Sequence, residues 1–125
     1  MLLLDTRLES GPNAAREARA SIARLEGRLN PQAVQDAILM VSELVTNSYR
    51  HSGIPEGAPI ELRVSVEGGT LRIEVADGGT AARPSIRTDR VEGGWGLKIV
   101  EQIASRWGTE TGPSGTIVWL ELDSV

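Results

Sequence analysis

A stripe of hydrophobic positions at helical spacing predicts the central element of the chain. Asn30 is a good N-cap, Pro31 suits a first helical position, and Gly53 suits a C-terminal stop. Between them, apolar or small residues recur every three or four positions, which is typical of one helix face packed on a core. These residues are Val34, Ala37, Ile38, Val41, Leu44, Val45 and Ser48. We therefore expect a long helix from Pro31 towards Gly53.

The same helix carries a polar pair, Glu43 and Asn47, one turn apart and therefore on one face. At about 100° per residue, this face is roughly opposite the apolar stripe. An isolated pair of this kind is more often a solvated helix face. Here Leu39 and Met40 flank the pair on either side, which is unusual for an open surface. The flanking residues favour the floor of a cleft.

Alternating apolar and polar residues predict a β-hairpin after this helix. Residues 60–66 and 71–75 both alternate, and Gly68-Gly69 between them suits a tight turn. Two further strands are expected at residues 2–8, at a sheet edge, and at residues 116–122. A short strand is expected at residues 109–111.

Two more helices complete the predicted pattern. One covers residues 14–29 with Asn13 as its cap. The other is opened by the glycine-rich residues 93–96 and ends at Gly108. Its expected inner face is Leu97, Val100, Ile103, Ala104 and Trp107. The order of elements predicts an α/β (α+β) two-layer sandwich, with about three helices on one face of an antiparallel or mixed sheet.

Length and composition narrow the class of protein. The 125 residues are enough for one domain, 1–125, with a single core. A net charge of -4 and only four aromatic residues give no support for direct nucleic-acid binding. The absence of cysteine excludes disulfides and thiolate catalysis, and no apolar run is long enough to span a membrane. The expected location is the cytoplasm, with no membrane partner.

Three stretches could carry chemistry. The glycine-rich opening of the last helix offers backbone N–H groups to a phosphate, or is simply a flexible helix entry. Asp77, before Gly78 and Gly79, either forms a turn or accepts a hydrogen bond from an exocyclic amine. Asn47 offers a neutral oxygen to Mg²⁺, and Glu43 could take a proton from a hydroxyl or a water.

Four motifs in order resemble the GHKL ATPase superfamily, which has the histidine-kinase-like ATPase (Bergerat) fold. Residues 43–51 look like its N-box and residues 75–79 like its adenine-binding box. Residues 94–100 resemble its second glycine box, and Gly115-Thr116 the Gly-Thr before its last strand. The similarity covers roughly residue 30 to the end. The adenine box departs from the family pattern, because Ala81 stands where the last glycine is usual.

The resemblance implies a role for each matching residue. It makes Asn47 the Mg²⁺ ligand and Asp77 the hydrogen-bond partner of the adenine amine. Thr116 would support the contact with adenine through its hydroxyl or a water. Gly79 would allow close approach to the base, and Glu43 would be the general base. Phosphates would be held by backbone groups of Gly94, Trp95, Gly96 and Leu97. The implied ligands are ATP and Mg²⁺.

Within the superfamily, residues 97–108 and 118–122 look like the bacterial anti-sigma-factor serine/threonine kinases, in their actinobacterial branch. The substrate of that family is an anti-anti-sigma factor (a STAS-type protein), and its members also bind a sigma factor. The alternative is a nucleotide-dependent switch that binds a partner without transferring phosphate.

Two further expectations concern surfaces. Residues 80–92, which contain Arg83, Arg87 and Arg90, lack a hydrophobic period and are expected to be a lid over the phosphates.

The last strand places either Ile117 and Trp119 or their alternate neighbours on the sheet face away from the helices. That face could hold a partner or a second copy in a homodimer.

Overall fold

The structure is a computed structural model that describes residues 1–51, 54–78, 98–123 and 125. Five strands form one antiparallel sheet in the order β1-β2-β3-β5-β4. Their bounds are β1 Leu2–Glu9, β2 Pro59–Glu67, β3 Thr70–Asp77, β4 Arg106–Gly112 and β5 Gly115–Asp123. The predicted α+β sandwich is therefore confirmed, with a purely antiparallel sheet.

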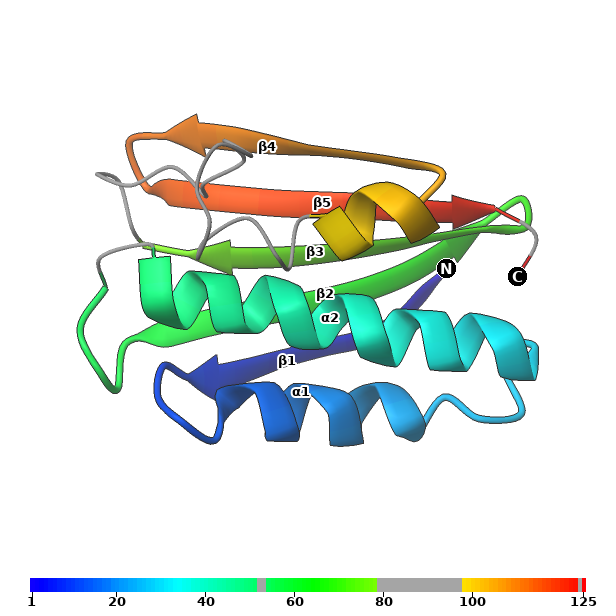
Figure 1. Cartoon of the computed structure of the whole chain (residues 1–125), viewed down its shortest axis with the longest axis horizontal. Helices are drawn as coiled ribbons and strands as arrows, with labels where there is room; N and C mark the ends of the chain where they lie inside the picture. Colours follow the sequence, from blue (N-terminus) through cyan, green and yellow to red (C-terminus); the bar gives the residue numbers. More distant parts are fainter. Residues whose placement is uncertain (52–53, 79–97, 124) are drawn as a thin grey trace.

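The helices lie on one face of this sheet (Figure 1). They are α1 (Ala14–Ala23), α2 (Pro31–His51) and a helical segment at residues 98–103. In Figure 1, α2 lies in the middle of the helical layer, between α1 and that segment. Within the described residues, no helix has both the length and the apolar character needed to cross a membrane.

The core lies between the two layers. The inward-facing residues of β2, β3 and β5 alternate with exposed or half-buried ones, as the sequence pattern predicted. Ile60, Leu62, Ile73 and Leu120 have no exposed surface. The Gly68-Gly69 turn of the hairpin is also confirmed. Both glycines have a positive φ, of 57° and 82°, which other residues rarely adopt.

The start of α2 follows the predicted capping. The Asn30 side-chain Oδ1 accepts a hydrogen bond from the backbone N–H of Ala33 at 2.7 Å, and Pro31 is the first helical residue. Asn13 stands at the N-cap position of α1, but its side chain makes no capping bond. Its Oδ1 accepts a hydrogen bond from Arg16 instead. The expected stop of α2 at Gly53 lies outside the described residues.

Two predicted helix ends are wrong. Helix α1 ends at Ala23 rather than residue 29, because the chain turns through Gly27 at φ 90°. Leu25 and Leu29 are nevertheless buried, because this turn folds back onto the core. The last helical segment ends at Ile103, and Trp107 and Gly108 belong to β4. In the ladder with β5, Trp107 lies opposite Leu120 and Gly108 lies opposite Trp119. This strand pairing outweighs the helical spacing of residues 97–107.

The outward orientation of Ile117 and Trp119 is settled by the burial of their neighbours. Val118, Leu120 and Leu122 face the helices. The Trp119 indole lies against Gly108, where an added Cβ would come within 2.9 Å of the ring. The Arg72 guanidinium lies 4.6 Å from the ring centroid. Whether this face binds a partner or a second copy stays a prediction.

Candidate functional site

The candidate site is built around the carboxylate of Asp77, at the end of the central strand β3. Asp77 follows the buried residues Leu71, Ile73 and Val75 in the alternation of β3, so its side chain points towards the helices. It is 8% exposed, which is low for a carboxylate. Asp77 is therefore the last residue of β3, with its side chain buried towards the helical layer.

A hydrogen bond joins this carboxylate to the central helix. The Ser48 hydroxyl donates to Asp77 Oδ2 over 2.7 Å, and both groups are buried. Buried polar groups need such partners, and a hydrogen bond to a charged acceptor is stronger than one between neutral groups. The bond holds the carboxylate beside the last turns of α2.

Ser48 is the site residue that sequence reasoning missed. Its spacing places it in the apolar stripe of the helix, and it is 2% exposed. The available signal was its chemistry, since a hydroxyl in an otherwise apolar stripe requires a buried partner. Nothing in the local sequence indicates that this partner is Asp77, twenty-nine positions away.

Strand β5 supplies the other side of the site. Thr116 is the cross-strand partner of Asp77 and is 2% exposed. Its hydroxyl lies 3.5 Å from that of Thr111 on β4. Gly115 packs on the backbone of Asp77, so closely that an added Cβ would lie 2.0 Å from the Asp77 carbonyl oxygen. Close packing at Gly115 explains why a glycine stands at the start of this strand.

The polar pair on α2 lies at the margin of the core. Asn47 is 7% exposed and Glu43 is half-buried, whereas Met40 is fully buried and Leu39 is 43% exposed. The helix face opposite the apolar stripe is therefore not open to solvent at Asn47. The physical reason is that α2 is covered on more than one side, by the sheet and by its two helical neighbours (Figure 1). The interpretation of the helix face with Glu43 and Asn47 as open to solvent is wrong for Asn47.

The remaining predicted site residues lie outside the described residues. These are Gly79, Gly94, Trp95, Gly96 and Leu97, together with the expected lid at residues 80–92. The structure thus brings Asp77 and Thr116 together, and ties them to the helix that carries Glu43 and Asn47.

The chemistry of the described groups fits a nucleotide and its metal. A buried carboxylate offers two acceptor oxygens to an exocyclic amine, and the Asp77 oxygen held by Ser48 fixes its orientation. The Asn47 amide offers one neutral oxygen ligand, which suits Mg²⁺ that is held mainly by phosphates and water.

Comparison with known proteins places the chain in a family. The profile of the histidine kinase-like ATPase domain matches residues 6–122. The chain belongs to this family, and the resemblance to GHKL ATPases is confirmed at this level. Domains of this family bind ATP. Among curated protein sequences, none matches the chain.

Solved structures share the fold. The RsbU and RsbW domains of Rv1364c from Mycobacterium tuberculosis align at TM-score 0.72 and 23% identity, over 97% of this chain and 32% of that one. A blue-light activated histidine kinase from Erythrobacter litoralis EL346 aligns at 0.63 and 20% identity, over 90% of this chain and 41% of that one. The Acinetobacter baumannii histidine kinase AdeS aligns at TM-score 0.57 and 13% identity, over 99% of this chain and 69% of that one. This chain thus spans about a third of the length of the first structure.

Proposed function

We propose that this protein is an ATP-dependent serine/threonine protein kinase of the anti-sigma-factor type. Its substrate would be an anti-anti-sigma (STAS-type) protein, and it would also bind and regulate a sigma factor. The observation that carries the proposal is the hydrogen bond between Ser48 and Asp77. It joins the helix with Glu43 and Asn47 to the strand end that would hold the base.

Each described residue has a defined part in this proposal. Asp77 would accept a hydrogen bond from the adenine amine, with Thr116 beside it. Asn47 would be a ligand of Mg²⁺, which supplies charge neutralisation at the phosphates. Glu43, half-buried one turn earlier, would take the proton of the acceptor serine or threonine. The acceptor oxygen then bonds to the γ-phosphorus as the bond to ADP breaks.

The histidine kinases among the similar structures raise the question of the phosphate acceptor. The only histidine of this chain is His51, inside the stretch that resembles the N-box. The likeness to the anti-sigma-factor kinases rests on residues 97–108 and 118–122. The second of these features, the likeness to the anti-sigma-factor kinases, supports a serine or threonine on a partner protein as the acceptor.

A transfer assay tests the proposal. The protein is incubated with γ-labelled ATP, Mg²⁺ and the STAS-type proteins of its own organism, and the label on each partner is measured. We expect one partner to be labelled on serine or threonine. If ATP promotes partner binding but no label is transferred, the protein is a nucleotide-dependent switch and the kinase assignment is wrong.

Two substitutions separate the roles on α2. Glu43→Gln keeps the shape and removes the charge, so ATP should bind as before while transfer slows about a hundredfold or more, as for loss of a general base. Asn47→Ala should lose the Mg²⁺ enhancement of ATP affinity, because it removes the metal ligand. Parental transfer by Glu43→Gln, or a normal Mg²⁺ response in Asn47→Ala, would overturn the assignment of that residue.

A further inference from the structure

Ser48 places a buried hydroxyl at a helix position where alanine would suit both the helix and the core. It is 2% exposed, and it belongs to the stripe that packs Val41, Leu44 and Val45 on the core. Alanine favours an α-helix more than serine does, and it buries no polar group. The helix and the core therefore give no reason for a hydroxyl at this position, and the reason has to be its partner.

The partner of this hydroxyl is the carboxylate of Asp77, which ends the apolar alternation of β3. Leu71, Ile73 and Val75 precede it on the same side of the strand and have no exposed surface, so an apolar residue would suit position 77 as well. The chain instead buries two polar side chains, and the Ser48 hydroxyl donates to Asp77 Oδ2 over 2.7 Å. Apolar groups of the same shape would serve stability about as well as this pair, so the pair indicates a role in ligand binding.

The hydrogen bond fixes the direction in which the carboxylate presents its oxygens. The terminal torsion of an aspartate side chain is broad, so the carboxylate plane can rotate when no partner holds it. A donor from α2 at Oδ2 restricts this rotation, and the backbone of Asp77 is itself held by its pairing with Thr116. The carboxylate therefore meets a ligand in one defined orientation.

A ligand can reach this carboxylate at the end of β3. Asp77 is 8% exposed and lines a hollow of about 570 Å³, together with Gly78, Gly115 and Thr116 among other residues. A carboxylate accepts hydrogen bonds, so it pairs with the 6-amino group of a purine, which is a donor. An unsubstituted purine leaves the carboxylate without this donor, and a 6-oxo purine sets one acceptor against another.

We propose that Ser48 is a positioning residue that sets the preference of this site for 6-aminopurine nucleotides. Because it holds Asp77 Oδ2, it aligns the carboxylate with the amine and increases the contribution of the amine to affinity. The inference rests on the proposed contact of Asp77 with adenine, but not on phosphate transfer or on a partner protein.

A comparison of two nucleotides tests this role. ATP and purine riboside 5′-triphosphate, which lacks the 6-amino group, are titrated into the full chain with Mg²⁺ by calorimetry. The amine preference is the dissociation constant of the purine nucleotide divided by that of ATP. The parent protein should prefer ATP about tenfold or more, because the purine nucleotide leaves a buried acceptor unpaired. In Ser48→Ala the preference should fall about threefold to tenfold, with little change in the affinity for the purine nucleotide.

Three further variants separate hydrogen bonding from packing. Ser48→Thr keeps a hydroxyl and should keep most of the amine preference. Ser48→Cys keeps nearly the same volume but is a weak donor, so it should lose the preference as Ser48→Ala does, and it takes the place of that variant if the alanine protein does not fold. Ser21→Ala is the matched control. Ser21 is 5% exposed on α1 and donates to the Glu17 carbonyl oxygen, so this variant should keep the parental preference.

The outcomes distinguish this inference from the proposed function. If the parent prefers ATP and Ser48→Ala keeps that preference, Ser48 is a structural residue and the inference is wrong. An equal loss of affinity for both nucleotides in Ser48→Ala would lead to the same conclusion. If the parent binds both nucleotides equally well, or binds neither, the proposed contact of Asp77 with adenine is wrong, and the role of Ser48 is wrong with it.

Discussion

At the scale of a single residue, the hydrogen bond from Ser48 to Asp77 has the largest consequence for function. It fixes one carboxylate oxygen of Asp77 in a buried position, at the junction of a helix and a strand. A buried carboxylate with one oxygen committed in this way offers a defined acceptor geometry to a ligand. A substitution that replaces an acceptor oxygen of Asp77 by a donor should therefore lower the affinity for the nucleotide.

Asp77→Asn makes this test. The side chain keeps its size, but one acceptor oxygen becomes an NH₂ donor that faces either Ser48 or the adenine amine. A mismatched buried hydrogen bond costs about 1–3 kcal/mol, so ATP affinity should fall roughly tenfold to a hundredfold. Asp5→Asn, on the exposed edge strand β1, is the control. Unchanged ATP affinity by calorimetry would rule out Asp77 as the adenine partner.

At the scale of an element, β5 begins where the sheet and the site meet. Gly115 has φ 136° and lies against the backbone of Asp77 and Gly78. The start of β5 and the end of β3 are therefore in contact through backbone atoms, with no side chain between them. This contact sets the position of Asp77 relative to Thr116, its partner in the ladder.

Gly115→Ala should destabilise the protein by about 1–3 kcal/mol or more. The added Cβ would lie 2.0 Å from the Asp77 carbonyl oxygen, in a backbone conformation that favours glycine. Gly112→Ala is the matched control in the same turn, because its Cβ meets no heavy atom within 4 Å. Urea unfolding measures both variants. Equal stability of the two would show that the contact at Gly115 relaxes freely.

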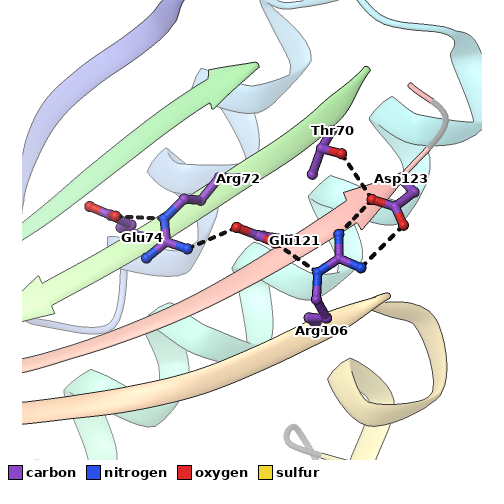
Figure 2. A network of polar contacts seen from close by, with 6 residues as sticks. All are labelled: Thr70, Arg72, Glu74, Arg106, Glu121 and Asp123. Carbon is purple, nitrogen blue, oxygen red and sulfur yellow. Dashed lines mark hydrogen bonds and ion pairs between the residues drawn. The ribbon is translucent and has the colours of Figure 1, made fainter. Parts of the chain in front are cut away.

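At the scale of the whole molecule, the outer face of the sheet joins three strands through one charge network (Figure 2). Hydrogen bonds from Arg106, and then from Arg72, hold the pKa of the Glu121 carboxyl below its usual value. Arg106, followed by Thr70, lowers the pKa of Asp123 in the same way. Since both carboxylates bind protons less readily in the folded state, the network links stability to pH.

The sign of this dependence follows from the lowered pKa values. A carboxylate with a lowered folded pKa stabilises the protein above its unfolded pKa, near 4 for Asp and Glu, and loses that contribution as the pH falls further. Glu121→Gln should therefore lower the urea midpoint at pH 7 and flatten the loss of stability below about pH 4. Glu101→Gln, which changes an exposed carboxylate on the helical face, is the control. If the urea midpoint of Glu121→Gln falls below about pH 4 as steeply as that of the parent protein, Glu121 does not contribute to the pH dependence of stability.

The sequence by itself determined the elements whose signals are local. The alternation in residues 60–66 and 71–75 and the Gly-Gly turn fixed the hairpin, since side-chain period and backbone sterics act over a few residues. The order of four motifs likewise indicated the ATPase family, which the match over residues 6–122 confirms.

Only the tertiary structure decided the features that depend on distant partners. Trp107 and Gly108 had helical spacing, but pairing with β5 placed them in β4. Asn47 lies opposite the apolar stripe of its helix and is nevertheless buried, because the spacing of one helix cannot show how many neighbours cover it. Ser48 had the spacing of a core residue, yet its hydroxyl is bonded to Asp77. In each case the free energy comes from contacts between residues far apart in sequence, which local patterns do not encode.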